Sequence, residues 1–299
     1  MIDKIIKGIK YRLDEENLTA EVIEKRNGYE GDIIIPETVV FNKVAYRVTS
    51  IGSSAFWGCD SLTSIVIGNG VTSIEGGAFK YCSSLTSIVI PDGVTSIEGG
   101  AFKYCSSLTS IVIPDSVTSI GSSAFSGCSS LTSIVIGNGM TSIGSSTFYD
   151  CSSLTSIVIP DSVTSIGESA FRGCSSLTSV VVAEGNTVYD SREQCNAIIH
   201  TATNTLISGC QNTIIPESVK SIGDYAFYYC SSLTSIVIPD SVTSIGEAAF
   251  MGCDSLKSIT FNGTKMQWNS IELGDEWNCE IPAQIVRCTD GNVKIEDCD

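Results

Sequence analysis

The chain has 299 residues, of which 42% are hydrophobic and 17% are charged, so it contains enough apolar material for a substantial core. Its 33 acidic and 17 basic side chains give a net charge of −16, and residues 230–299 alone hold 11 acids against 4 bases. Such a surface repels phosphate backbones and anionic lipids, so we expect no nucleic-acid partner. The sequence contains no run of about 18 apolar residues, which argues against a membrane span.

Residues 1–30 are charged and do not share the pattern that follows, so we predict that they form an N-terminal cap. They contain no continuous apolar stretch and no small-residue cleavage site of the kind found in secretory signals. Two expectations follow. The chain either remains inside the cell or is exported with a signal that this sequence lacks.

From about residue 31 to residue 260 the sequence repeats itself every 23 residues, and the stretch CSSLTSIVIPDSVTSIG occurs unchanged from Cys105, Cys151 and Cys230. Counting each unit from its cysteine, the pattern is C-x-x-L-x-x-I-x-I-P-x-x-V-x-x-I-x-x-x-A-F-x-x. Apolar residues at positions 1, 4, 7, 9, 13, 16, 20 and 21 fit neither a helix nor one long strand. They fit a coil that bends several times around a core and stacks on its neighbours.

Position 6 to position 9, Ser-Ile-Val-Ile, is β-branched and alternating, so we predict a strand with isoleucine inward at 7 and 9 and valine outward at 8. Proline at position 10 ends the strand because it cannot donate to a ladder. Valine at 13 and isoleucine at 16 form a second inward pair, and Ala-Phe at 20 and 21 fills the far side. Eight phenylalanines at position 21 are expected to stack into one continuous spine.

The chain contains 13 cysteines, most of them at position 1 of the repeat. Equivalent positions in stacked coils point in the same direction, which is poor geometry for a disulfide. We therefore expect these cysteines to be buried free thiols that act as small apolar residues. No paired C-x-x-C motif is present, so we expect no metal site, and no cofactor motif is found.

The unit L-x-x-I-x-I-P-x-x-V-x-x-I-x-x-x-A-F-x-x-C resembles the BspA-like leucine-rich repeat proteins, also described as Treponema-pallidum-type repeats. The resemblance covers about residues 31–260. It implies a right-handed, mostly β, leucine-rich repeat solenoid with a parallel sheet, capped at both ends. It also implies a role at the bacterial cell surface, or as a secreted protein, in adhesion to host proteins or other cells.

The repeat is interrupted once and fades at its end. Residues 183–216 are longer than the regular spacing allows and form an irregular island, which is either a structural adjustment or a recognition element. Beyond residue 260 the pattern fades, and we predict that residues 261–299 form a C-terminal cap. Its Trp268 and Trp277 are expected to cover the last coil, with stacking on a ligand as the alternative.

Three surfaces are candidates for binding a protein or glycan. The first is the outward valine row at position 8, and the second is the variable edge at positions 22 and 23, where aromatic side chains recur. The third is the island. The candidate residues are Val89, Val112, Val135 and Val158 on the valine row, Trp57, Tyr81, Tyr104 and Tyr149 on the edge, and Tyr189, Arg192 and His200 in the island.

Each surface also has a plain structural interpretation, because valine favours strands and exposed loop positions vary freely. Catalysis is not indicated. His200 is the only histidine and has no nucleophile motif near it, and neither a phosphate loop nor an H-E-x-x-H motif occurs. We expect a non-enzymatic binding protein, with an intracellular interaction scaffold as the alternative. A threonine-lined ice or crystal binder is a third hypothesis, and the oligomeric state is left open.

Overall fold

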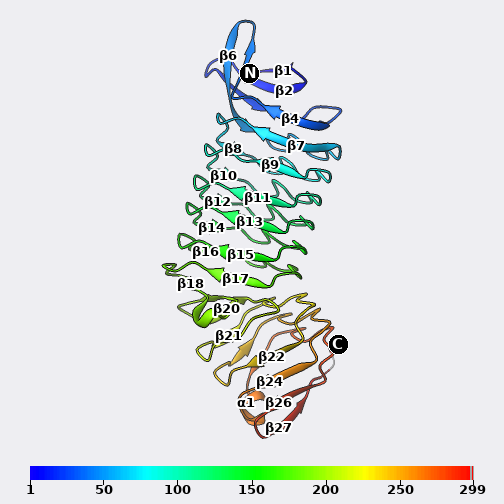
Figure 1. Cartoon of the computed structure of the whole chain (residues 1–299), viewed down its shortest axis with the longest axis vertical. Coiled ribbons are helices and arrows are strands. Elements are labelled where there is room, and N and C mark those ends of the chain that lie inside the picture. Colours follow the sequence, from blue (N-terminus) through cyan, green and yellow to red (C-terminus); the bar gives the residue numbers. More distant parts are fainter. Residues whose placement is uncertain (297, 299) are drawn as a thin grey trace. The chain divides into compact units, whose positions relative to one another are not determined.

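The computed structural model describes residues 1–296 and 298, and it divides into two compact units. The N-terminal unit comprises residues 1–152 and 165–170, and the C-terminal unit comprises residues 153–164 together with the described residues from 171 onward. In each unit, successive turns of the chain stack on one another as short parallel strands (Figure 1). The predicted leucine-rich repeat solenoid is confirmed.

An antiparallel group of strands opens the N-terminal unit. β1 pairs with β2 and β2 pairs with β3 in antiparallel fashion, after which β3 pairs with β6 in parallel and starts the stack. β5 forms a hairpin with β6, and β4 pairs in parallel with β7. The bounds are β1 (Ile2–Ile6), β2 (Ile9–Asp14), β3 (Thr19–Val22), β4 (Gly31–Ile35), β5 (Thr38–Phe41) and β6 (Val44–Ile51).

Each regular coil contributes a strand over the Ser-Ile-Val-Ile stretch, as predicted. In Ser110–Ile113 and Ser156–Ile159 both isoleucines are buried and the central valine is exposed, because alternate side chains of a strand point to opposite faces. Ile136 in the strand between them is half-buried. The strands are β7 (Leu62–Ile67), β9 (Ser87–Val89), β11 (Ser110–Ile113), β13 (Ser133–Ile136), β15 (Ser156–Ile159), β17 (Ser179–Val182), β22 (Ser235–Ile238) and β24 (Ser258–Phe261). They pair in shorter sheets, namely β4-β7-β9, β11-β13, β15-β17 and β22-β24-β26-β27.

A two-residue Ser-Ile strand on the second side of each coil explains why Thr-Ser-Ile occurs twice per repeat. These strands extend the sheet begun by β6 in the N-terminal unit and form a second ladder in the C-terminal unit. The Ser-Ile strands are β8 (Ser73–Ile74), β10 (Ser96–Ile97), β12 (Ser119–Ile120), β14 (Ser142–Ile143), β16 (Ser165–Ile166), β21 (Ser221–Ile222) and β23 (Ser244–Ile245), and β25 (Glu272–Leu273) continues the ladder after β23. Register joins like to like, for example Ser96 to Ser119 and Ile97 to Ile120.

The phenylalanine spine forms, but it is interrupted. In the N-terminal unit Phe56, Phe79, Phe102, Phe125 and Phe148 stack in order, with adjacent ring centroids 5.0–5.7 Å apart. In the C-terminal unit Phe227 stacks on Phe250 at 5.0 Å. The prediction of one continuous spine is wrong here, because Gly209 of the island lies against the Phe227 ring, where a Cβ would come within 2.3 Å of Cε1.

The cysteines at position 1 are buried free thiols, as predicted. The thiols of Cys82, Cys105 and Cys128 also donate to the carbonyl oxygen of the phenylalanine in the preceding coil, at 3.0–3.2 Å. Burial raises the pKa of the Cys128 thiol to about 12, so it stays protonated and unreactive. The cysteine therefore fills the core and satisfies a backbone oxygen at the same time.

The island inserts an antiparallel turn between the coils of the C-terminal unit. β18 pairs with β19 and β19 with β20 in antiparallel fashion, and β20 then pairs in parallel with β21 to restart the ladder. A short 3₁₀ turn, η1, follows β18. The bounds are β18 (Tyr189–Asp190), η1 (Arg192–Gln194), β19 (Ile198–His200) and β20 (Thr205–Ser208).

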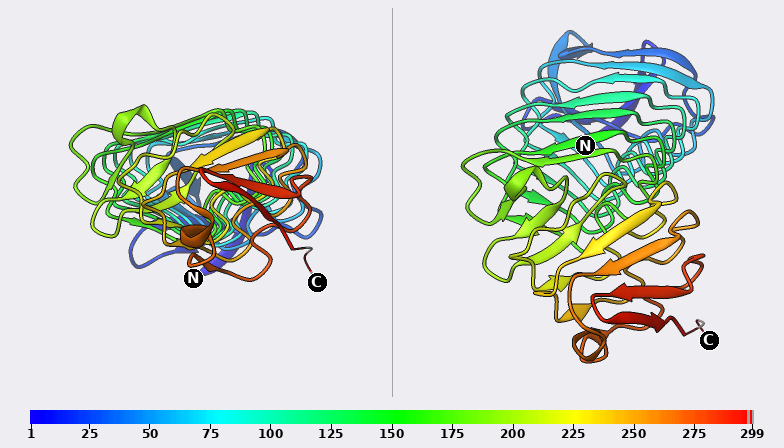
Figure 2. Two further views of the ribbon diagram at one scale, coloured as in Figure 1. Left: turned by 90° about the horizontal axis from the view of Figure 1, so that it is seen from below. Right: turned by 60° about the horizontal axis from the view of Figure 1, so that its bottom comes forward.

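The C-terminal unit ends in a short helix and a hairpin. α1 (Lys265–Trp268) carries a Thr264 capping box, and β26 (Ile285–Cys288) pairs with β24 in parallel and with β27 (Gly291–Lys294) in antiparallel fashion (Figure 2). Trp268 packs against Phe261 and Trp277 packs against Phe250, and both indoles are buried, as predicted for residues that cover the last coil. A disulfide joins Cys279 to Cys298, with Cα atoms 5.3 Å apart, and the sequence analysis did not anticipate it.

Candidate binding surfaces

The outward residues at position 8 form an apolar row, which we call the valine face. In the N-terminal unit the register brings Val66 beside Val89 and Val112 beside Val135, and Val112 is 60% exposed. In the C-terminal unit Val158 lies beside Val181. The structure thus places all four predicted valines outward on sheet strands, with Val89, Val112 and Val135 in one unit and Val158 in the other.

Threonines beside these strands use their hydroxyl groups within the fold. The hydroxyls of Thr86 and Thr178, next to the valine face, donate to the threonine carbonyl oxygen of the preceding coil at 3.1 and 3.0 Å, and so does that of Thr95 on the second side, at 3.2 Å. These bonds reinforce the stacking of coils. They also remove from these threonines the outward donors on which the ice-binding hypothesis depended.

Positions 22 and 23 of the coils lie in a turn, and position 23 has a left-handed backbone. Its φ is +66° at Gly58, +63° at Tyr81, +61° at Tyr104 and +73° at Gly127. Glycine accepts this conformation freely, whereas another residue gives up about 1 kcal/mol. Tyrosine at this position therefore has to be stabilised by what its ring contacts.

Tyr81 and Tyr104 stack on each other, with ring centroids 5.0 Å apart and planes 13° from parallel. The two side chains remain 42% and 41% exposed, and Lys80 and Lys103 place their ammonium groups 5.2 and 5.3 Å from the respective ring centroids. We call this group, with the exposed Trp57 of the preceding coil, the tyrosine edge. Tyr149 is half-buried and stands at position 22 of a later coil, whereas Tyr81 and Tyr104 stand at position 23.

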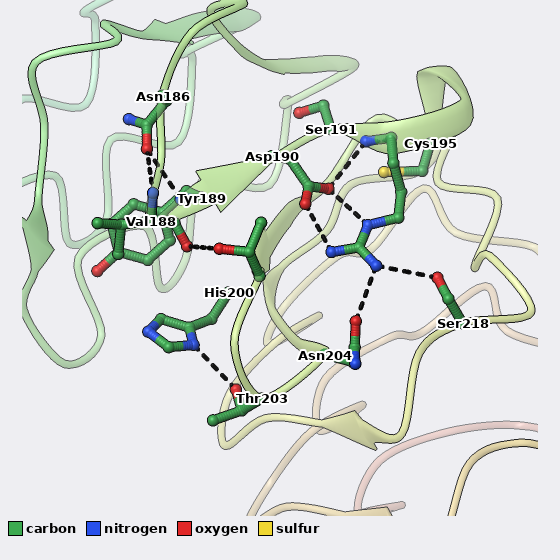
Figure 3. A network of polar contacts seen from close by, with 12 residues as sticks. Asn186, Val188, Tyr189, Asp190, Ser191, Cys195, His200, Thr203, Asn204 and Ser218 are labelled. Carbon is green, nitrogen blue, oxygen red and sulfur yellow. Dashed lines mark hydrogen bonds and ion pairs between the residues drawn. The ribbon is translucent and has the colours of Figure 1, made fainter.

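The three island candidates have partners in the island or directly after it (Figure 3). Arg192 forms a two-pronged ion pair with Asp190, through Nε at 2.8 Å and Nη2 at 2.6 Å, and its Nη1 donates to Asn204 and Ser218. The hydrogen bonds to the Asp190 carboxylate raise the pKa of Arg192 above its usual value. Every prong of the guanidinium is therefore engaged, which makes Arg192 a structural residue.

Tyr189 and His200 are neighbours on paired strands, with ring centroids 5.7 Å apart in an edge-on arrangement. Tyr189 is only 6% exposed, and the Nδ1 atom of His200 lies 3.0 Å from the Thr203 hydroxyl. No other group of catalytic character faces this imidazole among the contacts of the described residues. The island thus contributes packing and hydrogen bonds, and we do not retain its residues as binding candidates.

Sequence reasoning missed one aromatic cluster in the C-terminal unit. The guanidinium carbon of Arg172 lies 3.7 Å from the Tyr228 ring centroid and 4.2 Å from that of Tyr225. Tyr229 packs beside Tyr228 at 4.6 Å, and its ring covers Gly252. The pattern of aromatic residues at positions 22 and 23 contained this signal, but a cation from another coil could not be foreseen.

The described part of the chain holds no group of three or more potential metal ligands. None of its helices has the length and apolar character that crossing a membrane requires.

The repeated strands, the paired inward isoleucines and the phenylalanine stack define a leucine-rich repeat protein of the solenoid class. Residues 49–178, 95–206 and 204–272 match the BspA type leucine rich repeat region, in 6 copies. The chain belongs to this family.

Among solved structures, the chain is similar to a leucine rich cell surface protein from Faecalibacterium prausnitzii, with 25% identity and a TM-score of 0.65 over 91% of this chain and 98% of that one. It is also similar to the pneumococcal vaccine antigen PcpA, with 20% identity and a TM-score of 0.60 over 97% of this chain and 88% of that one; this second likeness concerns the fold. No curated protein matches the chain.

Proposed function

We propose that this chain is a non-enzymatic binding protein of the bacterial cell surface that holds a protein ligand on its valine face. The observation that carries the proposal is the apolar row in the N-terminal unit, where Val89, Val112 and Val135 are 58–60% exposed on neighbouring strands. Contiguous exposed apolar patches are a feature of protein contact surfaces. The similar structure from Faecalibacterium prausnitzii is that of a cell surface protein, which supports the proposed location of this chain at the cell surface.

The valine face suits a protein better than a small molecule. In the N-terminal unit its valines stand exposed on sheet strands, whereas a small ligand needs a pocket that buries most of its surface. A protein partner can cover several valines at once, and the interactions of a few central residues would dominate its affinity. The serines at position 6 are exposed beside the valines and provide hydrogen-bonding groups along the row.

Binding of the purified chain to immobilised extracellular-matrix and neighbouring-cell proteins tests the proposal. We expect Val112→Lys to weaken binding of a captured ligand by about tenfold or more, because a buried lysine at the centre of an interface loses its hydration. Ser122→Lys adds the same charge at an exposed position of the same coil outside the valine face, and it serves as the matched control. Equal binding by both variants would remove the valine face from the proposal.

The location is tested separately by antibody labelling of intact cells of the source organism. Labelling before permeabilisation supports a surface protein. Labelling only after permeabilisation would favour the intracellular scaffold, for which the buried free thiols are the supporting observation.

A further inference from the structure

We propose that the tyrosine edge is a second binding site, separate from the valine face, which takes an acidic glycan, a polysaccharide segment that carries carboxylate or sulfate groups. The proposal shares the binding role proposed above but depends on different residues. It starts from the unfavourable backbone of Tyr81 and Tyr104. Both are left-handed at a position where Gly58 and Gly127 show that glycine fits, so the turn itself does not require tyrosine.

The two ends of the tyrosine stack differ. The outer face of Tyr104 lies on the backbone of Gly127, since a Cβ there would be 2.3 Å from the ring carbon Cδ1. The inner face of Tyr104 meets Tyr81. In the coil before Tyr81 the equivalent residue is Gly58, which places no side chain on the ring. The Tyr81 ring remains 42% exposed, with the Lys80 ammonium over it at 5.2 Å from its centroid.

Two cations lie beside the stacked rings. Lys80 and Lys103 hold their ammonium groups near the rings, and neither forms a salt bridge with a described residue. The two positive charges are therefore available to an anion that contacts the rings. They provide attraction for an anion, whereas the net charge of the chain disfavours a long phosphate polymer.

The backbone at this edge cannot recognise a peptide. The N–H of Tyr81 donates to the carbonyl of Lys103, and the N–H of Tyr104 donates to that of Ser126, both at 2.8 Å. An extended peptide would find these donors occupied, so recognition must go through the rings, phenols and ammonium groups. A pyranose ring places its C–H face on an aromatic ring and directs an acidic substituent sideways, which matches partly exposed tyrosine rings beside lysines.

The second tyrosine cluster supplies an internal control. Tyr229 has the same left-handed backbone, with φ of +53°, and its ring lies on Gly252 as Tyr104 lies on Gly127. Its surroundings differ, because the nearby carboxylate of Glu280 raises the pKa of Tyr229 and Arg172 already contacts the rings of Tyr225 and Tyr228. We therefore expect no acidic-glycan binding at this cluster.

The test measures binding of the full chain to four immobilised probes: a heparin oligosaccharide, an unsulfated polygalacturonate oligomer, a neutral cello-oligosaccharide and a glutamate-rich peptide. We expect one or both acidic oligosaccharides to bind, with sulfate and carboxylate distinguished by the first two probes. The neutral sugar and the peptide should not bind. Binding should weaken as salt increases.

Tyr81→Gly removes an exposed ring and places glycine at a left-handed backbone position that glycine tolerates better than tyrosine, so the variant should fold. We expect it, and separately the Lys80→Ala/Lys103→Ala variant, to lower acidic-glycan affinity by about tenfold. Tyr229→Gly is the matched control and should bind as the unmodified chain does. The proposal is overturned if no acidic oligosaccharide binds, if Tyr81→Gly and the lysine variant bind unchanged, or if the glutamate-rich peptide or the neutral sugar binds equally well.

The two proposals fail separately. Val112→Lys should leave glycan binding unchanged, and Tyr81→Gly should leave binding of a protein ligand unchanged. Loss of glycan binding from both variants would instead indicate a shared surface and would contradict two distinct sites.

Discussion

The regular coils of the N-terminal unit and the island of the C-terminal unit are held together by different kinds of contact. In the coils, each inward group meets its own copy 23 residues away, as when Ile97 lies beside Ile120. In the island, unlike groups meet once, as when Arg192 binds Asp190, Asn204 and Ser218. Repetition leaves the exterior free to vary, whereas the island uses its polar side chains to hold its own loops and to bind the neighbouring coils.

The largest expected effect concerns the ring stack. Phe102 has a ring on both sides, at 5.1 and 5.2 Å, whereas Phe227 has Phe250 on one side and Gly209 on the other. We expect Phe102→Ala to lower the free energy of unfolding by about 3–5 kcal/mol. The loss for Phe227→Ala should be smaller than that for Phe102→Ala by about 0.5–1.5 kcal/mol, because it removes one aromatic pair instead of two. Urea unfolding of both variants checks this, and an equal or larger loss for Phe227→Ala would contradict it.

The island ion pair gives the next largest effect. Arg192→Ala leaves the partly buried Asp190 carboxylate without its partner, and we expect a loss of about 1–3 kcal/mol. Arg192→Lys should recover only part of it, since an ammonium cannot reproduce the two-pronged pair. Hydrogen exchange of residues 186–208 should report the loosening. Lys103→Ala in a regular coil is the comparison and should cost about 0.5–1 kcal/mol, so a larger effect there than at Arg192 would reverse our ranking.

One threonine in each region shows how much a hydroxyl group contributes to stability in the island and in the coils. Thr213 in the island is buried; its hydroxyl donates to Asn196 O at 2.7 Å and accepts from Cys210 N at 2.8 Å. Thr213→Val should therefore cost about 1–3 kcal/mol, because two buried backbone groups lose a partner. Thr95→Val removes one exposed bond of 3.2 Å and should cost less than about 1 kcal/mol. Thermal unfolding midpoints of the pair measure the difference, and similar shifts would argue against it.

The smallest expected effect is a change in stability and thiol reactivity at alkaline pH. Burial raises the pKa of Cys128 in a coil to about 12 and that of Cys195 in the island to about 11, above the usual value for a thiol. A folded-state pKa above the unfolded one contributes stability at lower pH, which is lost as pH rises from about 9 toward 12. We expect Cys195 to react with iodoacetamide before Cys128 as pH increases, with mass spectrometry locating the label. Rapid labelling of Cys128 at neutral pH would show that the coil opens.

The coil could be predicted from the sequence because one inward pattern is repeated many times. Isoleucine at positions 7 and 9 and phenylalanine at position 21 have the same environment in each regular coil, so periodicity alone identified them. Two features occur only once and have no periodic signal in the sequence. One is Gly209, which lies against the Phe227 ring where another phenylalanine was expected, and the other is the Cys279–Cys298 disulfide. Which edge residues stack, and which cations lie beside them, likewise depends on contacts between coils.

The thiol bonds between coils have a consequence for how such a chain can change in length. Because Cys82, Cys105 and Cys128 each donate to the equivalent carbonyl of the coil before, these coils present the same donor to the preceding coil. Deleting or duplicating 23 residues within the regular stretch rejoins the same donors to the same acceptors. Gene rearrangement can therefore lengthen or shorten the valine face in steps of one coil. The bonds of the island are not repeated in any other described coil, so we expect such insertions and deletions to be confined to the regular stretch.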